Sequence, residues 1–399
     1  MIDKKFNGTR LKEALQFRGM KLSELAEKTE ISKQSLSLYS NNDNMPPFTN
    51  IVKIAKALDF PYDFFMTEDT CTVATGNTYF RSQATANKRE RKAQMIKLEY
   101  AAKMYEVLLD YVDFPRLQLP IVKDIPMPST ILEADSYETL MNIELVAYQV
   151  RMQWDLGLEP IKDLQYVLQA HGIIVTGFED TGDKIDAFSQ KITATDGTEL
   201  FIIALETGVK SKSRLNFDMA HELGHIIMHR WGESNEDLTK EEFNIREKMA
   251  NVFAGAFLLP RKTFTRDVKP FATNLEYYRS LKKKWGVSIQ AMVYRARQLD
   301  IISANQFQYM MRIISKKGWK TKEPGDKPIG INSSLFQMAI DVMLDSDDYE
   351  TADLIQAFEE KGIIMHVKDL ENLMGLKPGT LKTEAKVVPF VTLKGQLQN

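Results

Sequence analysis

The chain has 399 residues, enough for two or three domains of ordinary size. Apolar residues make up 44% and charged residues 27%, a composition that excludes disordered and fibrous proteins. A single cysteine, Cys71, excludes an internal disulfide and with it the small disulfide-framed secreted domains. The start has no apolar core of signal-peptide length, and no run reaches the roughly 18 apolar residues of a membrane span. The sequence therefore predicts a cytoplasmic protein with no membrane partner.

The first 66 residues are predicted to form short helices separated by tight turns. Apolar residues recur at helical spacing in four segments, 10–18, 22–29, 33–40 and 49–58. Ile31 anchors the turn between the middle two segments, and Ser32 is a good N-cap for the second. Two short helices joined in this way place the second helix in the major groove of DNA.

The start of that second helix carries the expected DNA-reading side chains. Lys33, Gln34, Ser35 and Ser37 lie on its exposed N-terminal face if Leu36 returns the helix to the core. Glutamine pairs bidentately with adenine, and lysine reaches guanine or a phosphate. The alternative is a small helical domain that makes protein contacts only.

Residues 9–66 resemble the Xre/Cro-type helix-turn-helix family, in KLSELAEKTEISKQSLSLYSNN and the following PPFTNIVKIAKALDFPYDFF. Three positions depart from the family pattern. Lys21 replaces the usual Thr or Ser cap, Glu30 replaces the usual turn glycine, and Leu38 occupies an outward position that is often polar. A side chain at 30 makes a left-handed turn conformation less favourable. The resemblance implies binding to a double-stranded DNA operator, with a homodimer expected because such motifs read paired half-sites.

A linker and a long basic helix are predicted next. The polar stretch 67–78 is interpreted as a linker, and residues 80–112 as one helix that ends near the prolines of 115–130. Between Arg81 and Lys103 there are seven basic residues against two acidic ones. This charge is either a solvated helix face or an additional contact to DNA phosphates.

From residue 131 the pattern changes to α+β. Helices are predicted over 136–155 and 160–171, and again over 214–230 and 241–258. Between them lie β-branched-rich runs that are typical of strands, at 172–177, 187–193 and 199–205. The last hundred residues are predicted to be mostly helical, with a weak possibility of a strand at 386–393.

Three of the five histidines fall within FDMAHELGHIIMHR. His221 and His225 are four residues apart, so on a helix both imidazoles lie on one face and can hold one metal ion. Glu222 is adjacent to the first histidine, where its carboxylate can take a proton from the attacking water. The alternative is a pair of core histidines on a buried helix.

A catalytic zinc ion needs a third protein ligand. His229 lies two turns from His221, about 12 Å along the axis, so it cannot share their ion and is expected to pack behind the ligands. Glu247 is the better candidate, because small residues after it allow its helix to approach the first one closely. Asn251 lies one turn further, where its amide can bind a ligand histidine. The alternative is that Glu247 is simply solvated.

Most of residues 79–324 resemble the ImmA/IrrE metallopeptidase family. The resemblance rests on FDMAHELGHIIMH and EKMANVFAGAFLLP, on KKWGVSIQAMVYRARQLDIIS, and on the shorter matches YFRS, VAYQVRMQWDLGLEPI and DAFS. It implies a zincin-like fold that binds Zn²⁺ through His221, His225 and Glu247, with Glu222 as general base. Asp186 and Ser189 of DAFS are then expected at the rim of the active site. The KKWGVSIQ stretch also reads as a second helix-turn-helix, although a helical pair packed on the catalytic domain is favoured.

The predicted fold is multidomain: an all-α helix-turn-helix domain, then an α+β zincin-like metallopeptidase domain, then a helical region. The predicted boundaries are 1–66 for the DNA-binding domain, 67–130 for the linker and basic helix, 131–300 for the peptidase domain and 301–399 for a helical region of unknown role. Three functions fit this organisation. In the first, the chain is a DNA-binding regulator with an active zinc protease that cleaves a repressor or partner. In the second, it is a DNA-binding regulator whose zinc domain only senses a ligand. In the third, it is a protease that acts in trans in a toxin–antitoxin or phage-related system.

Overall fold

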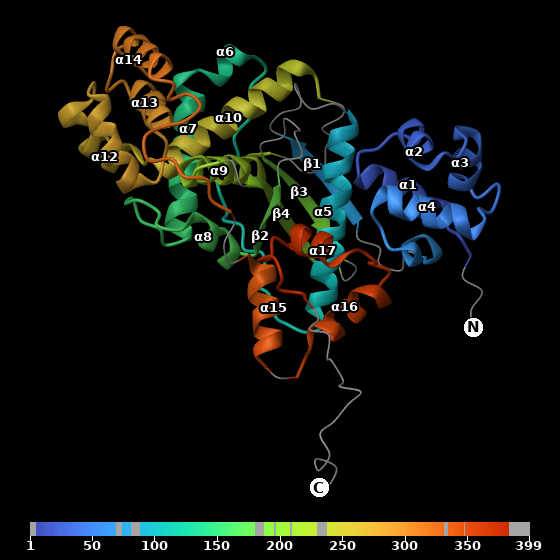
Figure 1. The fold of residues 1–399 in the computed structure, drawn as a ribbon. Coiled ribbons are helices and arrows are strands. Elements are labelled where there is room, and N and C mark those ends of the chain that lie inside the picture. The colour runs from blue at the N-terminus through green and yellow to red at the C-terminus, as the bar shows by residue number, and fades with distance from the viewer. Residues whose placement is uncertain are drawn as a thin grey trace, which may run out of the picture.

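A four-stranded sheet lies at the centre of the molecule with helices on both of its faces (Figure 1). The computed structural model describes residues 5–68, 74–80, 88–179, 187–194, 197–207, 210–229, 238–330, 334–346 and 348–382. The strand order is β1-β3-β4-β2. Strand β3 is antiparallel to both of its neighbours, and β2 is parallel to β4. The strands are β1 (Ala74–Phe80), β2 (Ile173–Glu179), β3 (Ala187–Thr193) and β4 (Glu199–Thr207).

The N-terminal helices form a bundle to one side of the sheet (Figure 1). They are α1 (Gly8–Phe17), α2 (Leu22–Thr29), α3 (Lys33–Ser40) and α4 (Phe48–Leu58), followed by the 3₁₀ turn η1 (Tyr62–Met66). Helices α2 and α3 have the predicted bounds, and the Ser32 hydroxyl caps α3 by accepting from the Ser35 N–H at 3.0 Å. Glu30 ends α2 in the left-handed conformation, with φ of 59°. The unusual residue in the turn therefore does adopt the backbone that glycine would adopt more easily.

Strand β1 corrects the prediction that residues 67–78 are only a linker. It pairs antiparallel with β3, Thr78 opposite Gln190 and Tyr79 opposite Ser189. The helix predicted from residue 80 begins as α5 (Lys88–Leu109), because Phe80 still belongs to the strand. A polar, glycine-containing segment can pair here because a ladder is made by backbone groups, which every residue except proline supplies.

Helix α5 packs against the N-terminal bundle, and this packing uses part of its basic run. Lys103 is buried and forms an ion pair with Glu99 at 3.0 Å. Arg89 forms an ion pair with Glu24 of α2 at 3.2 Å. Neither expectation for the basic run, a solvated face or a phosphate contact, therefore describes Lys103. Residues 81–87 lie outside the described part of the chain.

The helices between residues 131 and 316 form a second group. They are α6 (Ile131–Ala134), α7 (Tyr137–Gln153), α8 (Leu164–Ala170), α9 (Lys212–Met228), α10 (Lys240–Leu258), α11 (Arg261–Val268), α12 (Leu275–Trp285), α13 (Ile289–Gln298) and α14 (Ala304–Lys316), with the 3₁₀ turn η3 (Lys269–Phe271). Of these, α8 and α9 pack directly on the sheet. The pair α12–α13, considered as a second helix-turn-helix, buries Trp285 and Ile289 in the core of this region. None of the helices described is long and apolar enough to cross a membrane.

Side-chain alternation along the strands divides the core into two parts, one on each face of the sheet. Ala187 of β3 and Ile203 of β4 belong to the core shared with α9 and α10. Phe188 and Ile202, each one position away, belong to the core shared with α5, the N-terminal bundle and the C-terminal helices. Ser189 therefore lies on the α9 face of β3.

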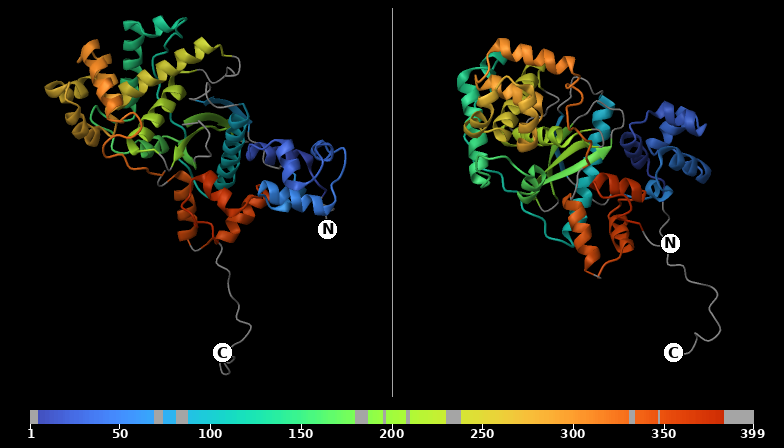
Figure 2. Two further views of the ribbon diagram at one scale, coloured as in Figure 1. Left: turned by 45° about the horizontal axis from the view of Figure 1, so that its top comes forward. Right: turned by 60° about the vertical axis from the view of Figure 1, so that its left-hand side comes forward.

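The region after residue 330 is helical, as predicted, over the part that is described. It comprises α15 (Leu335–Asp345), α16 (Thr351–Glu360) and α17 (Val367–Met374), which lie on the α5 side of the sheet (Figures 1 and 2). Arg18, the C-cap residue of α1, reaches α17 and donates to both carboxylate oxygens of Asp369 at 3.0 and 2.6 Å. The N-terminal bundle is thus held against both α5 and the C-terminal helices. Residues 383–399, with the possible strand at 386–393, are outside the described range.

Candidate metal centre and DNA-binding helix

Two helices bring the three candidate metal ligands to one point. His221 and His225 lie one turn apart on α9, with their Nε2 atoms 3.0 Å from each other. Glu247 on α10 places Oε2 3.4 Å from His221 Nε2 and Oε1 3.1 Å from His225 Nε2. One ligand atom from each residue lies within 4.8 Å of the others, a spacing at which one ion can contact all three.

A close approach of the two helices makes this convergence possible. Gly224 lies between the two histidines, and a Cβ there would be 3.0 Å from the Phe253 ring and 3.3 Å from Ala250 Cα. A side chain at this position would require the Phe253 ring or the α10 backbone to shift by a few tenths of an ångström. The small residues Gly224 and Ala250 therefore permit the close approach that brings the histidines and the glutamate together.

The ring nitrogens that face away from this point are both hydrogen-bonded. His221 Nδ1 donates to Asn251 Oδ1 at 3.1 Å, and Asn251 Nδ2 donates to the Glu247 backbone oxygen at 2.8 Å. His225 Nδ1 lies 2.9 Å from His229 Nδ1. An Nδ1–H bond of this kind leaves the Nε2 lone pair of each ligand histidine free for a metal ion.

The environment of His229 favours its neutral form. Burial lowers its pKa well below the ordinary value, and the neighbouring His225 lowers it further. A neutral His229 with its proton on Nε2 can accept the Nδ1–H of His225. This histidine, too far from His221 to share its ion, thus lies where it orients the second ligand.

Glu247 is mostly buried, unlike a solvated surface carboxylate, with its side chain 16% exposed. Burial alone would raise the pKa of Glu247. The His221 and His225 rings against its two oxygens outweigh that effect and hold the pKa of Glu247 well below its ordinary value. The carboxylate is therefore ionised at neutral pH, the form in which it binds a cation.

The expected general base, Glu222, is fully buried on α9. Ser189 Oγ of β3 donates to Glu222 Oε2 at 2.6 Å. Ser189 was expected at the rim of the site. The structure instead places this serine beneath Glu222, with no exposed surface. Only the alternation of β3 could have indicated this orientation from the sequence. Asp186, the other DAFS residue considered, lies outside the described residues.

A cavity of about 720 Å³ opens beside Glu247 and Asn251. Its walls come from the start of α9, from α10 and α13, and from the segment that follows α14; among them are Lys210, Arg214, Tyr294, Gln298, Lys320 and Glu323. A cavity of this size is within the range that holds small molecules or a few residues of a peptide.

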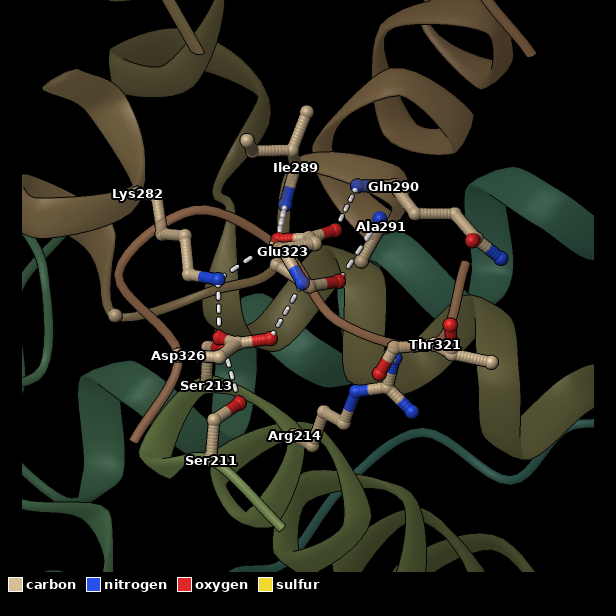
Figure 3. A network of polar contacts seen from close by, with 12 residues as sticks. Ser211, Ser213, Arg214, Lys282, Ile289, Gln290, Ala291, Thr321, Glu323 and Asp326 are labelled. Carbon is tan, nitrogen blue, oxygen red and sulfur yellow. Dashed lines mark hydrogen bonds and ion pairs between the residues drawn. The ribbon is translucent and has the colours of Figure 1, made fainter. Parts of the chain in front are cut away.

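The segment after α14 fixes that wall through a polar network (Figure 3). Glu323 accepts from the backbone N–H groups of Ile289 and Gln290 at 2.8 and 2.9 Å, which caps α13. Lys282 forms ion pairs with Glu323, at 2.8 Å, and with Asp326. The Ile329 N–H donates to the Lys210 oxygen at 3.0 Å, so the segment also holds the start of α9. Sequence reasoning did not find this network.

The predicted DNA-reading residues lie on α3 with unequal exposure. Lys33 and Gln34 are exposed. Ser35 and Ser37 are half-buried, and Ser35 Oγ lies 2.8 Å from Ser32 Oγ within the helix cap. The two long side chains are thus the ones most available to a DNA groove.

Comparison with protein families agrees with both regions. Residues 11–65 match the helix-turn-helix family, and residues 169–297 match the IrrE N-terminal-like domain, a peptidase family. The chain carries an Xre-type helix-turn-helix domain followed by an IrrE/ImmA-like peptidase domain. The IrrE-like match includes His221, Glu222, His225 and Glu247, and it runs from α8 into α13. Strand β1 lies before it. No curated protein matches the chain.

Proposed function

We propose that the chain is a cytoplasmic, DNA-binding transcriptional regulator whose IrrE-like domain is a zinc-dependent metallopeptidase. In this proposal it hydrolyses a peptide bond in a repressor or another partner protein. The convergence of His221, His225 and Glu247, with Glu222 beside them on α9, is the observation that supports it most.

The donor set suits zinc. Two imidazole nitrogens and one carboxylate oxygen are a common ligand set of catalytic zinc sites, which keep one further position open. When bound, the ion would supply a Lewis acid that polarises a peptide carbonyl and makes water a better nucleophile at neutral pH. Glu222 would accept the proton of the attacking water and deliver it to the leaving amine. Ser189 holds one Glu222 oxygen, which orients the carboxylate for that transfer.

The regulatory half of the proposal rests on the helix-turn-helix match and on the exposure of Lys33 and Gln34. The bundle would bind a double-stranded operator as a homodimer, with α3 in the major groove. Binding should weaken as salt rises, because phosphate contacts release counterions.

Two separate substitutions, Glu222→Gln and Glu247→Ala, test the proposal. Glu222→Gln should keep about one zinc per chain and lose cleavage by at least 100-fold, because the amide cannot take the proton. Glu247→Ala should lose zinc, whereas Glu241→Ala, an exposed carboxylate of the same helix, should keep both zinc and cleavage. Metal analysis and incubation with candidate repressors, with and without chelator, measure these outcomes. Wild-type cleavage by Glu222→Gln would contradict the mechanism.

The cavity beside Glu247 supports a second function, a regulator whose zinc domain senses a ligand without turnover. That function predicts zinc binding and operator binding but no cleavage by any variant. A protease acting in trans predicts cleavage without a salt-sensitive shift of operator DNA. Gel-shift and cleavage assays on one preparation therefore separate all three functions.

A further inference from the structure

Strand β1 pairs with β3 directly beside the proposed general base. Ser189 of β3 binds Glu222, and Tyr79 of β1 is the residue paired with Ser189. Neighbouring strands lie about 5 Å apart, so the β1 backbone passes within one strand spacing of the residue that holds the base. β1 is the edge strand of the described sheet, and without it β3 would offer a free row of backbone donors and acceptors at this place (Figure 1).

The pairing of β1 is irregular, in contrast to that of the inner strands. The register between β1 and β3 shifts between Thr75 and Thr78, which interrupts the ladder. The β3–β4 register continues without a shift from Ala187 to Thr193. The β1 sequence ATGNTYF also contains glycine and asparagine, which are unfavourable in strands. β1 is thus the strand whose loss would disturb the sheet least.

We infer that β1 occupies the peptide-binding edge of β3, and that an extended segment of a protein substrate binds by displacing it. This inference rests on the proposed peptidase function and adds the form of the substrate and how access to the site is controlled. The incoming segment would run antiparallel to β3, as β1 does, and would take over its backbone hydrogen bonds. Such strand addition is a common mode of peptide recognition, in which main-chain bonds supply affinity.

The exchange keeps the number of backbone hydrogen bonds made by β3 unchanged. Each β3 donor and acceptor that loses a β1 partner gains an equivalent one from the substrate, so no buried polar group is left unpaired. The substrate must therefore be extended and unpaired over several residues, as in an unfolded region or an exposed strand edge. A folded helix cannot make this ladder. Because β1 is tethered in place, it keeps the edge closed until such a segment competes with it.

A disulfide that fastens β1 to β3 tests the inference. Thr78→Cys/Gln190→Cys joins two directly paired residues in a Cys71→Ser background. Gln190 neighbours Ser189 along β3 and so faces away from Glu222. The matched control is Thr193→Cys/Glu199→Cys, which fastens β3 to β4, a pair that does not separate in the proposal. Thiol titration verifies that both bonds form.

The probe is a fluorescein-labelled, acetylated peptide with the β1 sequence ATGNTYF, added to the zinc-loaded full chain carrying Glu222→Gln. Fluorescence anisotropy should show binding to the reduced Thr78→Cys/Gln190→Cys chain and at least tenfold weaker binding after oxidation. Oxidation of the β3–β4 control should leave binding unchanged. A second variant, Thr78→Pro/Tyr79→Pro, removes backbone donors from β1 and should strengthen peptide binding about tenfold.

Equal peptide binding by the oxidised and reduced chains overturns the inference, because the peptide would then add without displacing β1. Absence of binding to every variant, the proline variant included, overturns it as well. Failure of the peptidase proposal is distinct: the zinc-loaded wild type would cleave no protein while peptide binding still depends on the disulfide. Conversely, equal cleavage of an unfolded protein by the oxidised and reduced chains would support the peptidase proposal. That result would contradict the inference that β1 controls access to the site.

Discussion

At the scale of single residues, the site depends on the groups behind the ligands. Asn251 and His229 each bind the Nδ1 of one ligand histidine, which fixes the ring and its tautomer. Asn251 is joined through its own amide to the backbone of the helix that carries Glu247. His229, by contrast, caps the C-terminus of α9, and its Nδ1 lies 2.9 Å from the Nδ1 of His225. Its contribution can therefore be measured separately.

His229→Ala should weaken zinc binding about 10- to 100-fold, because His225 loses the acceptor that orients its Nε2. Competition with a chromophoric chelator measures the affinity, and circular dichroism monitors the fold. The control is His366→Ala, since His366 is exposed and lies 3.7 Å from Asp59, remote in sequence from the ligands. Equal zinc affinity of the wild type and His229→Ala would show that the ring only fills space.

Glu30 offers a residue-scale test of the helix-turn-helix bundle. Its φ of 59° is unfavourable for a side chain with a Cβ, so Glu30→Gly should raise the free energy of unfolding by up to about 1 kcal/mol. Glu27→Gly, at an exposed interior position of α2, should lower it by about 1 kcal/mol. Urea denaturation of the two variants compares these effects. A loss of stability in both would mean that the Glu30 side chain makes contacts that outweigh the strain.

At the scale of elements, the polar network around Glu323 joins three separate segments. It caps α13, holds Lys282 of α12 and crosses the start of α9 (Figure 3). The Lys282 side chain is 11% exposed, and its two carboxylate partners are 2% and 9% exposed. Removal of this cation would leave two carboxylates close together with little access to solvent.

Lys282→Met should therefore lower the free energy of unfolding at pH 7 by about 3 kcal/mol. Burial alone would raise the pKa of Asp326, but hydrogen bonds from Lys282 and the Glu323 backbone hold it below its ordinary value. The folded pKa lies below the unfolded one, so this stabilisation is present above about pH 4 and is lost as the pH falls further. In the variant, the free energy of unfolding should no longer contain the contribution that the wild type loses at acid pH. Urea titrations at several pH values measure it.

Lys283→Met is the control, because Lys283 is exposed on the same helix. It should change the unfolding free energy by less than about 0.5 kcal/mol at every pH. An equally small effect of Lys282→Met would mean that solvent reaches the two carboxylates and that the network does not hold α9 and α13 together.

Elements were predictable where local signals agree and not where distant segments decide. Helix α3 has both a capping serine and apolar residues at helical spacing, and β3 contains Phe188, Ile192 and Thr193, which favour strands, so their bounds followed from the sequence. β1 has no such signal, because its pairing depends on the open edge of β3, more than 100 residues later. The ligand histidines follow from helical spacing. Ser189 and Glu323 do not, because their partners lie on other elements.

At the scale of the whole molecule, the DNA-binding bundle is attached to the body by a shared core and by two arginines, the buried Arg10 and the half-buried Arg18. Arg10 is 1% exposed and donates to Tyr100 Oη of α5 at 3.0 Å and to the Gly362 oxygen after α16 at 2.8 Å. Arg18 joins Asp369 of α17, which also packs against β2. The C-terminal helices thus contact both the bundle and the sheet whose opposite face carries the metal site.

Asp369→Ala should loosen this attachment without unfolding the peptidase-like region. Arg18 would keep its stacking on Phe17 and Phe60 and its bond to the Leu58 oxygen, but it would lose a bidentate, charge-assisted partner. Hydrogen exchange of the amides in α1–α4 should speed up about tenfold, and that of α9 and α10 should not change. Asp110→Ala is the control, because its contact with Lys361 is exposed and 3.9 Å long. Equal acceleration in α9 and α10 would show that the bundle and the metal site open as one cooperative unit, and no acceleration would show that the shared apolar core alone holds the bundle in place.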